Sequence, residues 1–293
     1  MTNLAFNLTQ ILISKRTGRF IWILLFCSFS LAAISQWYLY YLDTVFPKAE
    51  IEERFAPLTK KYGIEIVYEV DDTFLSNITN SIVAAGPGKN SKVIPIRHRV
   101  LMQYPVYLRK AFEKYPAEVI KKYLRAIYFA DQIDDEGFFF GGSFDPFRQI
   151  VYLVDNGSKD DESAIDTFHH EFSSLLLSRH SMVLNPWFEN NPKGFVYLYT
   201  TGADQLDIYK KASSCGTEED YAQGFMNTYG QTEFENDFNE YSAMIFTYPE
   251  KFKRIMARHP RVRGKFLVWL KFYQEIDPIF TEEYLLGAGG DAN

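Results

Sequence analysis

The sequence predicts an α+β fold, in which a small sheet is followed by a mostly helical half. Two runs rich in β-branched residues, 64–70 and 149–154, predict strands. Further along the chain, apolar residues recur at helical spacing in 165–176 and in 234–245. Because the strands come first and helices follow, we predict one α+β domain over residues 46–293.

The composition supports a large buried core and argues against a nucleic-acid partner. Of the 293 residues, 47% are hydrophobic and 17% are aromatic, which is enough apolar surface for one large domain. The formal net charge is −6, and the sequence has no long run of Lys and Arg. The two cysteines, Cys27 and Cys215, form no Cys-x-x-Cys motif. We therefore expect the fold to depend on its core and not on disulfides.

The first 45 residues have the pattern of a membrane anchor. Residues 20–42 contain no charged side chain, and these 23 residues are enough to span a bilayer with some tilt. Aromatic residues lie at the far end of this segment, and three cations precede it: Lys15, Arg16 and Arg19. Because such cations stay on the cytoplasmic side, we expect residues 46–293 to lie outside the cytoplasm, in the cell envelope.

A cleaved signal peptide is the alternative for the same segment. Its strongly apolar part, residues 20–34, has the length of a signal-peptide core, and small residues occur at 30–33. Either alternative makes residues 46–293 a periplasmic or extracellular domain.

Helices are expected before and between the two strands. Residues 51–62 look helical, with Pro57 as an expected break. Residues 105–130 are expected to be mostly helical, because Pro116 suits the first turn of a helix. A break is expected at 131–137, before the second strand.

A helix around residues 165–178 is the element that the rest of the chain is organised around. At about 100° per residue, one side of this helix is apolar and should face the core. The apolar side consists of Ile165, Phe168, Phe172, Leu175 and Leu176. The opposite side consists of Asp166, His170, Glu171, Ser174 and Ser178. The His-Glu pair on this polar side is a candidate site.

A second amphipathic helix is predicted over residues 234–248. Its apolar stripe consists of Phe234, Phe238, Tyr241 and Ile245. Pro249 should end this helix. A further helix is expected over residues 252–276, with Arg and Lys side chains on its outer face.

His170 and Glu171 match the first half of the motif His-Glu-x-x-His. In that motif, two histidines four residues apart bind zinc from one face of a helix, and the glutamate is a general base for the bound water. The fifth position is Ser174 in this sequence. A neutral hydroxyl is a poor zinc ligand compared with an imidazole, so the motif is altered at the metal itself.

The order of these elements resembles that of the zinc-binding metallopeptidases found as exported bacterial lipoproteins, in the gluzincin branch of the zincins. The resemblance runs from about residue 50 to about residue 255. Stretches 62–68, 116–124 and 141–153 look like the first strand, the first long helix and the edge strand beside the substrate cleft. Stretches 169–172 and 224–240 look like the zinc helix and the segment that supplies the third ligand.

The resemblance implies a zincin-like fold, zinc as the cofactor and a peptide or protein as the substrate. By this match, His170 and Glu240 are metal ligands, and Glu171 is the catalytic base. Tyr229 or Tyr241 would stabilise an oxyanion. Two further residues are candidates for accessory roles, His169 beside the metal ligand and Ser174 through a water molecule.

Two departures from the family's pattern put the zinc site in question. Ser174 stands where the second zinc histidine is expected, and Asn239 stands where a small residue usually precedes the ligand Glu240. His169 cannot replace the missing histidine, because it lies about 100° around the helix from His170. For His169 itself, a packed and hydrogen-bonded histidine is the favoured interpretation.

Two functions follow from this altered motif. One is a membrane-tethered metallopeptidase whose metal site is altered and whose hydrolysis is weak. The other is a catalytically inactive protein of the same fold that binds a peptide or a glycan in the cell envelope. Whether zinc is retained or lost separates the two.

Overall fold

A computed structural model describes residues 46–79, 92–135, 138–156, 160–201, 212–213 and 215–287. The chain divides into two compact units, Met1–Lys48 and Ala49–Asn293. The predicted anchor at residues 20–42, and its signal-peptide alternative, lie outside the described residues. Among the helices that the structure describes, none is both long enough and apolar enough to cross a membrane.

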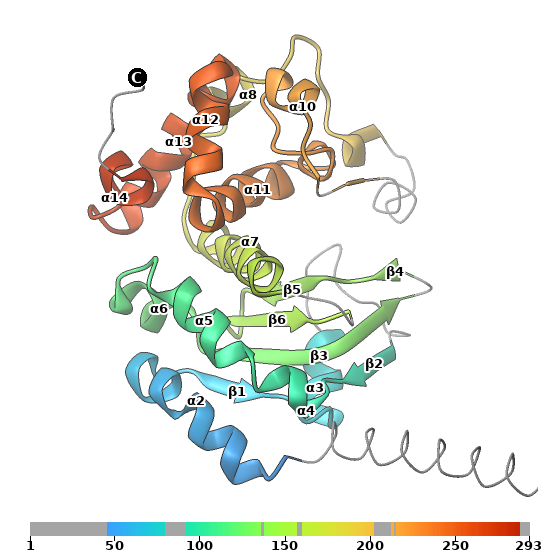
Figure 1. Cartoon of the computed structure of the whole chain (residues 1–293). Coiled ribbons are helices and arrows are strands. Elements are labelled where there is room, and N and C mark those ends of the chain that lie inside the picture. Colours follow the sequence, from blue (N-terminus) through green and yellow to red (C-terminus); the bar gives the residue numbers. More distant parts are fainter. Residues whose placement is uncertain are drawn as a thin grey trace, which may run out of the picture. The chain divides into compact units, whose positions relative to one another are not determined.

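A mixed sheet forms the first half of the larger unit (Figure 1). Its main strand order is β1 (Glu65–Val67), β3 (Ala126–Asp135), β6 (Ile150–Val154) and β5 (Gly142–Asp145). The pairs β1–β3 and β3–β6 are parallel, and β5 pairs antiparallel with β6. Two short strands, β2 (Lys92–Pro95) and β4 (Phe138–Phe139), pair antiparallel with β3. Strand β5 therefore forms the edge of the sheet that is nearest to the later helices (Figure 1).

Helices cover both faces of this sheet. They are α2 (Lys48–Tyr62), α3 (Asp72–Thr79), α4 (His98–Leu101), α5 (Tyr104–Phe112) and α6 (Ala117–Tyr123). Neighbouring side chains of a strand point to opposite faces. Tyr128 packs against Phe74 of α3, whereas Phe129 packs against Phe55 of α2 and Tyr104 of α5. Because both faces are covered, all five residues of β6 are buried and apolar.

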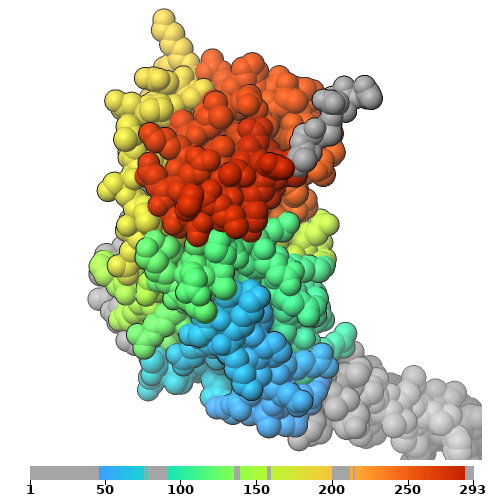
Figure 2. Space-filling model, turned by 90° about the vertical axis from the view of Figure 1, so that its left-hand side faces the viewer, coloured from blue at the N-terminus to red at the C-terminus, as the bar shows by residue number. Residues whose placement is uncertain are grey.

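The second half of the domain is helical. It contains α7 (Asp161–Arg179), α8 (Asn185–Phe188), η1 (Leu198–Thr201), α10 (Glu218–Gln223), η2 (Tyr229–Gln231), α11 (Phe234–Thr247), α12 (Pro249–Arg258), α13 (Pro260–Ile276) and α14 (Glu282–Leu286). Figure 1 shows α7 between the sheet and the other helices. Figure 2 shows the C-terminal helices, in red, resting on the green segment that contains α5 and α6. Helix α7 thus has apolar neighbours on both sides.

Local sequence explains where α7 begins and ends. The side chain of Asp160 accepts a hydrogen bond from the backbone N–H of Ser163, which caps the N-terminus. The last turn ends at His180, whose ring Nε2 lies 2.6 Å from the hydroxyl of Tyr123. Phe168 and Phe172 are fully buried and face α5, through Phe112, and the aromatic cluster around Tyr115.

The α+β fold class and the two central helices are confirmed, but four local predictions are wrong. Residues 126–130 are not helical, because they begin the ten-residue strand β3 and are buried between two layers of helices. The predicted break at 131–137 falls largely within this same strand. Pro57 lies inside the continuous helix α2. The expected helix 252–276 is two helices, since Pro260 lacks an N–H and starts a new helix.

We predict that Phe172→Ala lowers the free energy of unfolding by about 3–5 kcal/mol, because the substitution leaves a cavity where a buried ring was. The ring of Phe172 stacks on that of Phe168, with centroids 5.4 Å apart. Phe147→Ala is the control, because Phe147 is 69% exposed. Its effect should stay within about 0.5 kcal/mol. Urea denaturation of both variants measures this, and equal effects would contradict the central position of α7.

Candidate functional site

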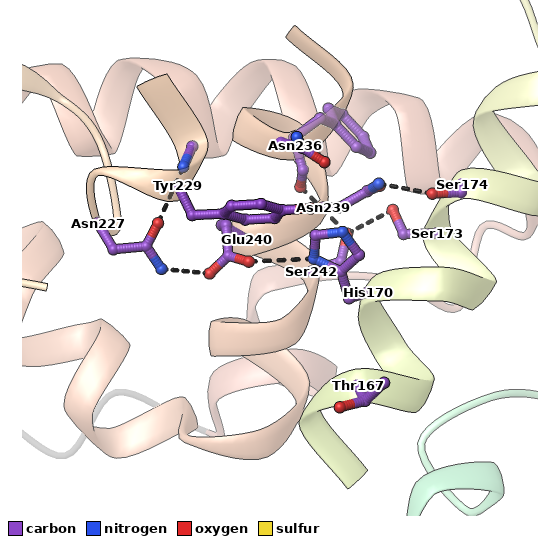
Figure 3. A network of polar contacts seen from close by, with 12 residues as sticks. Thr167, His170, Ser173, Ser174, Asn227, Tyr229, Asn236, Asn239, Glu240 and Ser242 are labelled. Carbon is purple, nitrogen blue, oxygen red and sulfur yellow. Dashed lines mark hydrogen bonds and ion pairs between the residues drawn. The ribbon is translucent and has the colours of Figure 1, made fainter. Parts of the chain in front are cut away.

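A seam of polar contacts joins α7 to α11 at the centre of the helical half (Figure 3). The hydroxyls of Ser173 and Ser242 lie 2.8 Å apart, and both residues are fully buried. Trp269 donates from its indole nitrogen to the Ser242 hydroxyl at 2.8 Å. These bonds fix how the two helices face each other, and they place His170 and Ser174 of α7 opposite Glu240 and Asn239 of α11.

His170 contacts Glu240 directly. Its Nδ1 lies 3.1 Å from Glu240 Oε1, and both side chains are only 12% exposed. The other carboxylate oxygen, Oε2, accepts a hydrogen bond from the side-chain amide of Asn227. The Asn227 carbonyl oxygen in turn accepts from the Gly230 backbone N–H at 2.9 Å. Both oxygens of Glu240 therefore have donors from within the protein, and the contact assigns a hydrogen to His170 Nδ1.

The charges around His170 keep its ring protonated. Burial acts to lower the pKa of His170, but the hydrogen bond to Glu240 and the charges of Glu171, Glu240 and Asp166 outweigh burial and raise that pKa to about 9. These contacts therefore favour the imidazolium form, in which both nitrogens carry hydrogen.

Two more glutamates lie near the same ring, at the start of α11. Burial and the charge of Glu235 raise the pKa of Glu233 to about 7, although the charge of His170 acts in the opposite direction. Burial likewise raises the pKa of Glu235, against the opposing effects of Ser174 and His170. Both glutamates are half-buried, and this burial disfavours the charged form of their carboxyl groups.

Ser174 and Asn239, the two departures from the zinc-helix pattern, contact each other. The side-chain amide of Asn239 donates to the Ser174 hydroxyl at 2.6 Å. Ser174 is 2% exposed and Asn239 is fully buried. A small side chain on α7 thus faces a larger one on α11.

Glu171 packs against the edge strand β5. It is 9% exposed, and a side-chain carbon added to Gly142 of β5 would lie only 2.6 Å from Glu171 Oε1. Gly142 therefore has to be glycine for α7 and β5 to approach this closely. Glu171 and Ser174 were predicted on the polar side of α7, opposite its apolar stripe, and the structure buries both. The reason is that α7 is covered by the sheet on one side and by α11 on the other.

The structure separates His169 and Tyr241 from this site. His169 is fully buried, with its Nδ1 2.9 Å from the Tyr115 hydroxyl and its ring stacked on Phe246. Burial lowers the pKa of His169 well below its usual range, so this ring is neutral. The Tyr241 hydroxyl is buried and donates to the Gly224 carbonyl at 2.9 Å.

Of the predicted site residues, the structure brings together His170, Glu171, Ser174, Tyr229 and Glu240. The ring of Tyr229 lies against that of His170, with centroids 5.8 Å apart. The sequence did not single out Asn227, Ser173 or Ser242. Asn227 lay inside the stretch 224–240 that was matched to the third-ligand segment, but its amide gave no signal for the contact that it makes with Glu240.

The residues of this seam do not fit a zinc site with three protein ligands. The distance between His170 and Glu240 does not decide the question, because two ligands of one tetrahedral zinc also lie about 3.4 Å apart. The third position decides it, since the Ser174 hydroxyl is neutral and already bonded to Asn239. Within the described ranges, no three His, Cys, Asp or Glu side chains converge as a metal-binding group.

No family matches the sequence, and no curated protein matches it. A crystal structure of "a putative zinc-binding metallo-peptidase" from Bacteroides caccae is similar in structure, at 13% sequence identity and with a TM-score of 0.49. The similarity covers 83% of this chain and 96% of that one.

The raised pKa of His170 leads to a prediction about pH. The pKa rises from 6.5 to about 9, so the stabilisation by the charged ring is complete below about pH 6.5. It is lost as the pH rises through about 9, and a shift of this size corresponds to at most about 3 kcal/mol. The difference in unfolding free energy between the protein and its His170→Gln variant should therefore shrink between about pH 6 and about pH 10.

Urea denaturation at several pH values measures this difference, and His180→Gln is the matched control. Burial lowers the pKa of His180, so its difference should not shrink over the same range. A constant difference for His170→Gln would mean that His170 is neutral in the folded protein.

Proposed function

We propose that this protein is a zinc-free, non-hydrolytic binding protein of the cell envelope, with a metallopeptidase-like arrangement of elements. The observation that carries the proposal is the buried hydrogen bond between Asn239 and Ser174. This bond fills the space in which a second zinc histidine would stand. The bonded oxygens of Glu240 support the same conclusion, because its carboxylate is already neutralised by protein donors.

In this proposal, the polar seam is structural. The imidazolium of His170 supplies a positive charge close to the carboxylates of Glu240, Glu171 and Asp166. It holds α11 against α7 with one charge-assisted hydrogen bond, which is stronger than a bond between neutral groups. The binding role then falls to surfaces of the helical half away from the seam, and the partner is a peptide or a glycan.

A zinc-dependent hydrolase is the competing function. Its ligands would be His170 and Glu240, and Glu171 would take a proton from the metal-bound water. The observation in its favour is that these three side chains gather at one seam between α7, β5 and α11. The hydrolase needs a third ligand in place of Ser174, which is the position that Asn239 closes.

The membrane tether remains part of the proposal. The uncharged residues 20–42, preceded by three cations, support a membrane-anchored protein whose residues 46–293 lie outside the cytoplasm. With the protein expressed in bacteria, protease added to intact spheroplasts should digest this domain. Complete protection of the domain in intact spheroplasts would reject the proposed orientation.

Zinc titration tests the central claim. We expect the protein and its Ser174→His variant to bind zinc no better than a His170→Gln control, because Asn239 blocks the new ring in the single variant. The double variant Ser174→His/Asn239→Ala provides space for two imidazoles on one helical face, about 6 Å apart. Its zinc affinity should rise at least tenfold, and adding Glu240→Ala should remove the gain.

Calorimetry measures the affinities, and circular dichroism checks that each variant is folded. Stoichiometric zinc binding by the unaltered protein, abolished by His170→Gln, would reject the zinc-free proposal and favour the hydrolase. Hydrolysis of a peptide library that requires Glu171 would reject it in the same way.

A further inference from the structure

An open groove lies on the other side of α11 from the seam. It has a volume of about 680 Å³, and Arg261 lies on its wall. The rest of its lining consists of residues 188–197 without Asn190, and this segment begins at the last residue of α8. Asp237 and Phe238 of α11 contact Trp187, the residue just before this segment. Asn239 and Glu240 contact α7 instead. The groove and the seam are therefore separate places.

Aromatic rings form the floor of the groove. The rings of Phe195 and Tyr197 meet edge to face at 5.0 Å, and Phe188 meets Tyr197 at 6.1 Å. The Tyr197 hydroxyl donates to Asp237 Oδ2 at 2.6 Å, so this ring cannot turn away from the floor. At the rim, apolar side chains face solvent: Val196 is 58% exposed and Phe188 is 38% exposed. Such a surface suits an apolar side chain of a ligand.

A buried ion pair holds this floor rigid from behind. Lys265 and Asp237 are fully buried, and the Lys265 ammonium lies 2.6 Å from Asp237 Oδ2. Trp187 donates to the same oxygen at 2.9 Å, and the ammonium lies 3.8 Å from the ring centre of Phe225. A floor supported in this way is formed before a ligand arrives, which lowers the entropy that binding costs.

Two cations stand at the wall of the groove. Arg261 is held in place by bonds from Nη1 to the carbonyls of Asn191, at 2.6 Å, and Asn190, at 3.3 Å. Lys193 is exposed on the turn before Gly194. Among the described residues, neither cation has a carboxylate within ion-pair distance, and Glu189 is the acidic residue of the lining. With two cations against one carboxylate, the lining has a net positive charge beside an apolar floor, in a protein of net charge −6.

We propose that this groove binds the C-terminal end of a peptide whose last side chain is apolar. Its carboxylate pairs with Arg261 and Lys193, and its side chain lies on Phe188, Phe195 and Tyr197. A guanidinium matches a carboxylate with two parallel hydrogen bonds, which a neutral amide end cannot provide. The volume suits two or three residues of a peptide. This inference rests on the proposed function, because it names the ligand class and the place for a protein that binds without cleaving.

The test uses the full chain in detergent micelles and the peptide acetyl-Gly-Gly-Phe with a free carboxylate. Calorimetry should show that this peptide binds at least tenfold tighter than its C-terminal amide or acetyl-Gly-Gly-Gly. Arg261→Gln should reduce the affinity for the free acid to that for the amide, and Lys193→Gln should reduce it severalfold. Lys271→Gln is the matched control, because Lys271 is an exposed cation elsewhere on α13.

Each outcome supports or overturns the proposal. Equal binding of the acid and the amide, or an equal loss with Lys271→Gln, would overturn it. Binding of 3-phenylpropionate as tightly as the peptide would overturn the peptide assignment. If Arg261→Gln does not fold, two variants at exposed positions, Lys193→Gln and Phe188→Ser, test the proposal in its place. Unchanged peptide binding by both would overturn it. Ser174→His/Asn239→Ala should leave peptide binding unchanged, so failure at the groove and failure of the zinc-free proposal give different results.

Discussion

The structure depends on a helix pair, α7 and α11, that meets through polar side chains in the middle of an aromatic core. Buried polar groups destabilise a protein unless each finds a hydrogen-bond partner. Here the partners are supplied across the pair, between Ser173 and Ser242 and between Ser174 and Asn239. Such bonds form only in one register of the two helices. They therefore determine the position of His170 against Glu240, and with it the character of the site.

A second buried polar contact organises the other side of α11. The pair formed by Lys265 and Asp237 links α13 to α11, and Trp187 and Tyr197 bring the segment after α8 to the same carboxylate. Burial lowers the pKa of Lys265 to about 8 and raises that of Asp237, so each charge depends on its partner. Replacing one partner would leave an uncompensated buried charge. The contact ties the floor of the groove to the core, although it stays out of reach of solvent.

The sequence predicted the parts of this fold that have a clear periodicity. The helices α7 and α11 each have an apolar stripe long enough to recognise, and β6 is a short apolar run between turns. The strand β3 was not predicted, because Ala126 to Ala130 read as the end of a helix when their burial between two layers is unknown. The site was predicted only in part for a similar reason. Ser174 and Asn239 each appeared as a separate departure, 65 residues apart, and their contact exists only in the folded chain.

That contact changes what the serine means. Taken alone, Ser174 looks like a single lesion in a zinc motif, which one substitution would repair. Packed against Asn239, it is half of a buried contact between two helices, in which the larger side chain belongs to α11. Restoring only the histidine would place two large side chains in a space that holds one, and overpacked cores are strained.

The charge at the site centres on His170. The hydrogen bond to Glu240 and the nearby carboxylates raise the pKa of His170, which favours the protonated ring. The hydrogen bond from Asn227 to Glu240 supplies a further donor toward the carboxylate. Both oxygens of Glu240 thus accept hydrogen bonds from side chains of the protein itself.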